Sequence, residues 1–313
     1  MMVPIQVIRW YRMQCYDGTD SCAIVVPIRR YCQFKFDGVE YVVSDQSCKP
    51  TVAKGECKTD VYVQTTSIAG DRIFKISVKQ QNADFLENKM SHERAVEIFG
   101  SQADAIIMRA TESIKENFLN TPIIYFERKG RTDAKSITLG WKFEFVNKTG
   151  GNLSASMQLT TRQIVDVYSG TSLPDDKKNA IVNGEEVTDS GIADFILVVD
   201  QDKNMTIEDF EKGLMTIEKF VETEKPTIYF ACKALNYRAE KDKWDGDRPL
   251  SVYVDWYIKE SKLVGELRFD EPLHHKGNEI GNNVRNLLAE LGINSDNFLR
   301  LKDVIDSSIS VCG

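Results

Sequence analysis

Alternation of hydrophobic and other residues is the clearest pattern in the first third of the chain. Valines alternate with other residues within 58–64, and hydrophobic and polar residues alternate again toward the end of 72–79. A period of two is typical of strands that bury one face. A Gly70-Asp71 pair lies between the two segments. The pattern therefore predicts an antiparallel hairpin.

The rest of the chain mixes strand and helix patterns. Residues 83–118 have a helical period, with Ser91 as an N-cap and Gly100 dividing two helices. Residues 169–190 are polar and are predicted to form a loop. Strands are predicted at 22–36, 40–44, 121–128, 136–146, 152–160, 192–199, 226–237, 250–259 and 262–269, and further helices at 161–168, 205–223 and 279–291. This order predicts an α/β or α+β fold with a mixed β-sheet core flanked by helices.

The charge balance limits how the chain could bind nucleic acid. It has 40 basic and 47 acidic residues, a formal net charge of -7, so bulk charge does not favour DNA binding. Residues 120–150 nevertheless carry six basic and three acidic residues, whereas residues 180–225 carry four and twelve. A local basic surface could face DNA, although a solvated face explains such a run equally well.

Histidine is scarce, with His92, His274 and His275 the three in the sequence. Chemistry that needs several histidines is therefore disfavoured, and carboxylates, lysine and a bound ion are expected instead. The seven cysteines form no CxxC motif, and the N-terminus lacks the pattern of a signal peptide. We expect reduced thiols and a cytoplasmic protein. No apolar run reaches the roughly 18 residues of a membrane span, so no membrane association is expected.

The predicted hairpin brings a carboxylate and a lysine to one end. If the chain turns near Ala69-Gly70, Asp60 lies opposite Lys79, and Ser77 shares the face of Lys79 because side chains alternate along a strand. A shift of the turn by one residue would move the partners by two positions and still leave the carboxylate and the lysine close. Mg²⁺ binds one or two carboxylates together with waters and phosphate oxygens. A lysine beside it can orient or deprotonate the attacking water. The pattern therefore suits phosphodiester hydrolysis.

Two segments of this hairpin resemble the PD-(D/E)xK nucleases, and the type II restriction endonucleases in particular. Residues 55–61, Gly-Glu-Cys-Lys-Thr-Asp-Val, are similar to a Gly-x-Pro-Lys-Thr-Asp-Val strand of those enzymes. Residues 74–79, Phe-Lys-Ile-Ser-Val-Lys, resemble their second strand. The resemblance implies a restriction-endonuclease-like fold, with Asp60 as a metal ligand and Lys79 as the catalytic lysine. Cys57 stands where proline is common, at a position that shapes the turn.

The second acid of the motif is missing from the hairpin, because Ser77 stands in its place. Some restriction enzymes with Ser-x-Lys recruit a glutamate from the following helix. Glu93, fourteen residues after Lys79, is the candidate for this role. Glu87 is its competitor, and Glu56 is a candidate upstream acid.

These features predict a Mg²⁺-dependent endonuclease that cuts double-stranded DNA at specific sites, as a homodimer. Asp60 and Glu93 would hold the ion, Lys79 would assist the water and Ser77 would shape the site. The candidate substrate-binding residues are Gln81, Lys58, Arg128, Lys129 and Arg131.

Two regions are predicted. Residues 1–170 would form the nuclease core with an N-terminal β-rich extension, and residues 171–313 would form an α/β region for DNA recognition or dimerisation, either separate from the core or continuous with it. Two alternatives stay open because of Ser77. One is a phage- or defence-associated nuclease of low specificity, and the other is a catalytically inactive DNA- or protein-binding module on the same fold.

Overall fold

The computed structural model describes residues 33–313, apart from 45–46, 54, 81–84, 89 and 201–204. The chain divides into two compact units, each assembled from two separate stretches of sequence. Unit 1 comprises 1–83 and 168–224, and unit 2 comprises 84–167 and 225–313. Both contain helices and mixed sheets, so the fold is α+β. The division differs from the predicted one, in which residues 1–170 formed one region.

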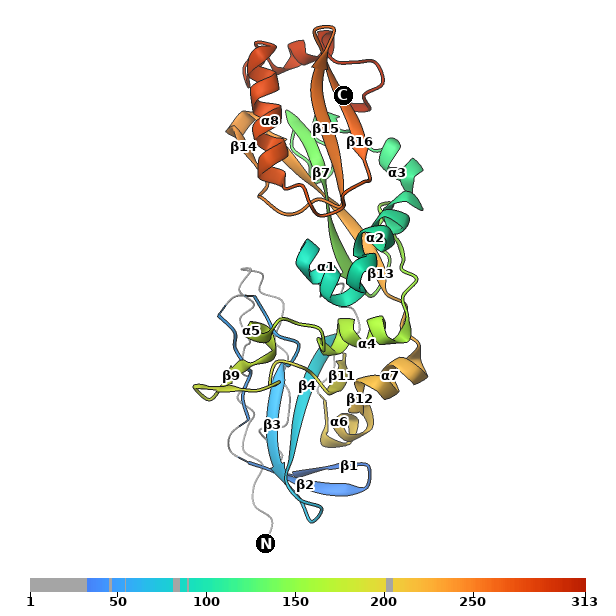
Figure 1. Cartoon of the computed structure of the whole chain (residues 1–313), viewed down its shortest axis with the longest axis vertical. Coiled ribbons are helices and arrows are strands. Elements are labelled where there is room, and N and C mark those ends of the chain that lie inside the picture. Colours follow the sequence, from blue (N-terminus) through green and yellow to red (C-terminus); the bar gives the residue numbers. More distant parts are fainter. Residues whose placement is uncertain (1–32, 45–46, 54, 81–84, 89, 201–204) are drawn as a thin grey trace. The chain divides into compact units, whose positions relative to one another are not determined.

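Unit 1 is built on a sheet that has six strands within the described residues (Figure 1). In spatial order they are β1 (Gln33–Phe36), β2 (Val39–Val43), β3 (Val61–Thr66), β4 (Arg72–Gln80), β11 (Phe195–Val199) and β12 (Met215–Thr216). Neighbouring strands are antiparallel except β4 and β11, which are parallel. The strand patterns predicted at the hairpin, at 40–44 and within 192–199 are confirmed. The predicted strand residues 22–32 lie outside the described part.

The parallel pairing of β4 and β11 explains why each unit is discontinuous. Parallel neighbours cannot be joined by a tight turn and need a long crossover connection. Here the chain leaves unit 1 after β4, forms residues 84–167 of unit 2, and returns before β11. Two strands that are far apart in sequence, β4 and β11, are therefore neighbours in this sheet.

One face of the unit 1 sheet carries an aromatic core. Phe74 is fully buried, with ring centroids 4.8 Å from Phe195 and 5.0 Å from Phe34. Ile76 and Val78 alternate with it along β4 and join the same core, together with Phe210 of helix α6 (Ile207–Gly213). Because side chains alternate, Lys75, Ser77 and Lys79 occupy the opposite face.

Two predictions in unit 1 are wrong in detail. The helix expected at 205–223 is divided into α6 and α7 (Ile217–Glu224), because the intervening β12 pairs with β11 and forms the edge of the sheet. The loop expected at 169–190 contains α5 (Asp175–Lys178) and a hairpin of β9 (Ala180–Val182) and β10 (Glu185–Val187). Asn183-Gly184 turns this hairpin with positive φ at both residues, and Asn-Gly is a strong hairpin signal.

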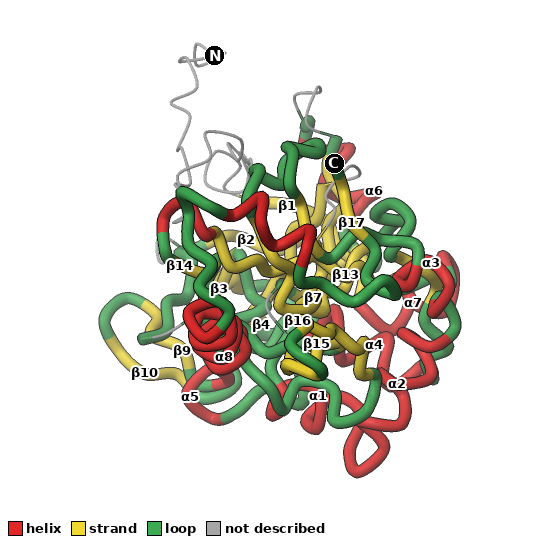
Figure 2. The backbone as a smooth tube through the Cα atoms, turned by 90° about the horizontal axis from the view of Figure 1, so that it is seen from above, coloured by secondary structure: helices red, strands yellow, loops and turns green. Residues whose placement is uncertain are grey.

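Unit 2 is built on a sheet that has nine strands among the described residues, with the long strand β7 near its centre. The strands are β5 (Phe85–Glu87), β6 (Ile124–Tyr125), β7 (Ser136–Val146), β8 (Ser154–Ser156), β13 (Tyr229–Arg238), β14 (Lys243–Trp244), β15 (Val252–Lys259), β16 (Lys262–Arg268) and β17 (Val311–Cys312). Helix α8 (Gly277–Glu290) packs along β15 and is seen from the side in Figure 1 and from its end in Figure 2. The strands predicted at 136–146, 250–259 and 262–269 are confirmed.

The helical segment predicted at 83–118 contains one error. Residues Phe85–Glu87 form a strand, because Phe85 and Glu87 pair with the end of β7. The helices that follow are α1 (His92–Phe99), α2 (Ala103–Glu112) and α3 (Lys115–Leu119), with a 3₁₀ turn at Gly100–Gln102. Ser91 caps α1 and Gly100 ends it at φ 62°, as predicted. A fourth helix, α4 (Thr161–Ser169), leads back to unit 1. No described helix is both long and apolar enough to span a membrane.

Candidate active site on the β3–β4 hairpin

The register of the hairpin puts Asp60 opposite Ser77, and not opposite Lys79 as predicted. Val61 pairs with Ile76, and the preceding position faces Ser77 in the same register. The turn is centred one residue earlier than expected. Its geometry explains the difference: the Ser67 carbonyl accepts a hydrogen bond from the Gly70 amide at 3.1 Å. Gly70 also adopts a φ of 110°, which favours glycine.

The Asp60 carboxylate is held by the neighbouring strand through one oxygen. Its Oδ2 accepts a hydrogen bond of 2.8 Å from the Val78 amide and a long one of 3.4 Å from the Ser77 hydroxyl. Within the described part of the chain, no hydrogen bond or ion pair engages Oδ1. Asp60 is half-buried. The carboxylate is therefore oriented, and one oxygen stays available for a ligand.

Lys79 lies on the same face as Ser77, two positions further along β4. Two strand residues span about 7 Å, so Lys79 is close to the carboxylate without being its direct partner in the register. Lys79 is half-buried and has no ion pair among the described residues. Ser77 between them is fully buried. The hairpin thus presents an oriented carboxylate and an unpaired lysine on one face.

The segment before Asp60 is fixed by the second stretch of unit 1. The amides of Lys58 and Thr59 both donate to the Gly191 carbonyl, at 2.9 and 3.2 Å. A Cβ added to Gly191 would lie 1.9 Å from the Lys177 carbonyl oxygen and 3.0 Å from the Cys57 Cβ. Only glycine permits this close approach. The position of Asp60 therefore depends on a residue more than a hundred positions away.

Replacing Gly191 with alanine is expected to destabilise unit 1 by about 1–3 kcal/mol, because the added methyl group must displace the backbone at Lys177. The displacement would also move the segment that carries Asp60. Thermal unfolding followed by circular dichroism measures the first effect. Gly184→Asn is the control, because no atom lies within 4 Å of a Cβ added there and Asn tolerates positive φ. Equal melting temperatures for both variants would contradict the packing argument.

A lysine–aspartate pair that sequence analysis did not single out shares this face of the sheet. Lys75 Nζ lies 3.3 Å from Asp194 Oδ2 and donates to the Asp189 carbonyl at 2.9 Å. Burial raises the pKa of Asp194, although Lys75 opposes the shift. Strand alternation places Lys75 on the face of Ser77 and Lys79. Its partner Asp194 immediately precedes β11, far from Lys75 in the sequence, so no local pattern indicates the pair.

Glu93, the predicted second metal ligand, lies in unit 2, whereas Asp60, Ser77 and Lys79 lie in unit 1. It is exposed in the first turn of α1. Hydrogen bonds from its own amide and from Ser91 lower the pKa of its carboxyl group. Glu93 is therefore ionised at neutral pH and oriented at the start of its helix.

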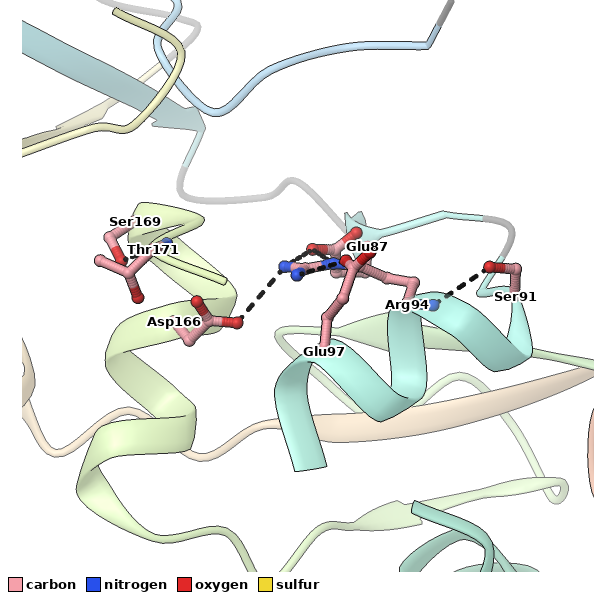
Figure 3. A network of polar contacts seen from close by, with 7 residues as sticks. All are labelled: Glu87, Ser91, Arg94, Glu97, Asp166, Ser169 and Thr171. Atoms are coloured by element: carbon pink, nitrogen blue, oxygen red, sulfur yellow. Dashed lines mark hydrogen bonds and ion pairs between the residues drawn. The ribbon is translucent and has the colours of Figure 1, made fainter. Parts of the chain in front are cut away.

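The competing acid, Glu87, is engaged by Arg94 (Figure 3). Arg94 donates to Glu87 Oε1 from Nη2 at 2.8 Å and from Nε at 3.2 Å. It also donates to Glu97 at 3.2 Å and lies 3.5 Å from Asp166. Arg94 is 7% exposed. Burial lowers the pKa of Arg94, but its three acidic partners together raise it. Glu87 is thus part of a largely buried charge network that links β5 and α1 to α4.

The other predicted site residues have different surroundings. Lys58 is only 9% exposed, which suits packing better than contact with a phosphate. Glu56 is exposed, and Gln81 lies outside the described residues. Arg128, Lys129 and Arg131 are exposed around one turn of unit 2. Backbone hydrogen bonds between Lys129 and Thr132 close this turn.

Comparisons with known proteins were made at three levels: models of protein families, curated proteins and solved structures. None of them matches this chain. The geometry of the hairpin and the resemblance of its sequence are therefore the observations from which a function can be inferred.

Proposed function

We propose that this protein is a Mg²⁺-dependent endonuclease that hydrolyses phosphodiester bonds of double-stranded DNA. One observation carries the proposal: Asp60 is oriented through Oδ2 by the Val78 amide while Oδ1 stays available, and Lys79 lies unpaired on the same face. Mg²⁺ prefers carboxylate oxygens and keeps several waters. A single oriented, half-buried aspartate fits this requirement.

Each residue has a defined part in the proposed reaction. Asp60 would hold the ion through its available oxygen, and waters and phosphate oxygens would fill the other coordination positions. The bound ion would polarise the scissile phosphate and lower the pKa of a water. Lys79 would orient or deprotonate the attacking water and offset charge that develops on the phosphate. Ser77, which donates to Asp60, would position the carboxylate.

We also propose that the protein cuts at specific sites and acts as a homodimer. Both proposals rest on the resemblance of residues 55–61 and 74–79 to type II restriction endonucleases. Palindromic sites favour two-fold dimers. The exposed cations Arg128, Lys129 and Arg131 are the proposed phosphate contacts of unit 2, since contacts of this kind fix a protein on the duplex.

The direct test is incubation of supercoiled plasmid with the full-length protein, with Mg²⁺ and with EDTA in its place. We expect cleavage that requires Mg²⁺. Discrete fragments would support the restriction-like reading, and a smear would support a nuclease of low specificity. Intact plasmid under every condition, together with DNA binding in a gel-shift assay, would replace the proposal with a catalytically inactive DNA-binding module.

A further inference from the structure

Two of the three histidines of the chain meet at one aspartate in unit 2. His92 is the first residue of α1, and Asp104 lies in the first turn of α2. His274, which is 170 residues further along the chain than Asp104, lies in the connection between β16 and α8. The two imidazole rings are also close to each other, with ring centroids 4.1 Å apart.

The donor atoms are spaced as ligands of one metal ion would be. His92 Nε2 lies 3.0 Å from Asp104 Oδ1, and His274 Nε2 lies 3.3 Å from Asp104 Oδ2. The ligand atoms of all three residues lie within 4.8 Å of one another. Bonds of 2.0–2.1 Å in a tetrahedral zinc site place neighbouring ligand atoms about 3.3 Å apart. Small side-chain rotations would therefore suffice for all three residues to bind one ion.

The side chains also suit a particular class of ion. Imidazole nitrogen suits Zn²⁺, Cu²⁺, Fe²⁺ and Ni²⁺, whereas Mg²⁺ prefers oxygen ligands. The side chains of His92, Asp104 and His274 are 30%, 45% and 44% exposed. A three-ligand site with this access to solvent leaves a coordination position for water.

We propose that His92, Asp104 and His274 form a site for one divalent transition-metal ion, such as Zn²⁺, completed by water. The site uses different residues and a different class of ion from the proposed Mg²⁺ centre at Asp60. It would tie the beginnings of α1 and α2 to the connection before α8. Because Glu93 follows His92 directly, the same ion would steady the turn of α1 that presents Glu93.

The experiment is a titration of the full-length protein with Co²⁺ followed by absorption spectroscopy, and with Zn²⁺ followed by calorimetry, both without DNA. We expect a one-to-one complex whose cobalt spectrum has the d–d bands of a nitrogen- and oxygen-ligated ion. His274→Ala and Asp104→Asn should each weaken this binding by at least about tenfold. Circular dichroism should show that both variants remain folded.

His275→Ala is the matched control. His275 is the neighbouring histidine, but it does not contact Asp104. Its Nε2 lies 3.3 Å from Glu271 Oε2, and its ring centroid lies 4.2 Å from that of Tyr253. Its substitution should leave metal affinity unchanged. Equal affinities of the wild type and the folded His274→Ala and Asp104→Asn variants would overturn the proposal. Binding with only sulfur-to-cobalt charge-transfer bands would also overturn it, because the ion would then be bound by cysteine. Neither readout depends on nuclease activity, so failure of the proposed function would not affect this test.

Discussion

The Asp60→Asn variant is expected to cleave plasmid DNA at least about a hundredfold more slowly than the wild-type protein in the presence of Mg²⁺. The expectation follows from charge, because an amide is a much weaker ligand for Mg²⁺ than a carboxylate. The asparagine oxygen can still accept the hydrogen bond that the Val78 amide donates to Asp60 at 2.8 Å. The hairpin should therefore keep its structure while it loses the negative charge.

The control for Asp60→Asn is Asp71→Asn. Asp71 is exposed near the turn at the other end of the same hairpin. Its substitution should leave the initial rate of plasmid cleavage unchanged. If Asp60→Asn cleaves as fast as Asp71→Asn and the wild type, the hairpin is not the active site.

Substitutions of Lys79 distinguish its two proposed roles. Lys79→Ala should reduce the cleavage rate by about 10²–10⁴-fold, the usual contribution of a positioned acid or base. Lys79→Arg keeps the positive charge but cannot accept a proton from water, because arginine stays protonated. Partial activity in Lys79→Arg would indicate stabilisation of phosphate charge, and no recovery relative to Lys79→Ala would indicate proton transfer or strict positioning. Wild-type activity in Lys79→Ala would exclude both roles.

Replacing Arg94 with methionine is expected to destabilise unit 2 by about 3–5 kcal/mol, the usual cost of breaking a buried ion pair. Arg94 is 7% exposed and contacts Glu87, Glu97 and Asp166. Its removal leaves three carboxylates close together without their shared cation. Urea unfolding followed by tryptophan fluorescence measures the loss, because Trp141, Trp244 and Trp256 all lie in unit 2.

Two further variants test the origin of this destabilisation. Arg109→Met is the matched control, since Arg109 is exposed and donates only to the Ala105 carbonyl. It should change the free energy of unfolding by no more than about 0.5 kcal/mol. Adding Glu87→Gln to Arg94→Met should restore part of the stability by removing one of the uncompensated charges. If the double variant is less stable than Arg94→Met, the loss comes from packing of the arginine stem and not from charge.

The hairpin shows how far local pattern determines structure. Alternation along 72–79 predicted β4, the core face of Ile76 and Val78, and the shared face of Ser77 and Lys79, and all of these are confirmed. The register was wrong by two residues. Alternation specifies the face of a side chain but not its partner, which depends on where the turn closes. Here the hydrogen bond between Ser67 and Gly70 decides that point.

Errors in the helices have a similar origin. Phe85–Glu87 and Met215–Thr216 lie in segments with helical patterns. In the structure, however, the first pairs with β7 and the second pairs with β11. Backbone pairing of this kind overrides the preference of a short segment and leaves no periodic signal. In contrast, the Asn183-Gly184 turn had a recognisable signal within a segment interpreted as a loop.

The sequence by itself determined the α+β class, most strand positions and the face shared by Ser77 and Lys79, because each of these depends on residues close together along the chain. Only the tertiary structure decided which distant segments meet. The carbonyl of Gly191 fixes the segment before Asp60, β11 lies beside β4, and His274 reaches the aspartate that also binds His92. The physical reason is that such contacts arise from long crossovers and packing between elements, and neither imposes a spacing on the sequence.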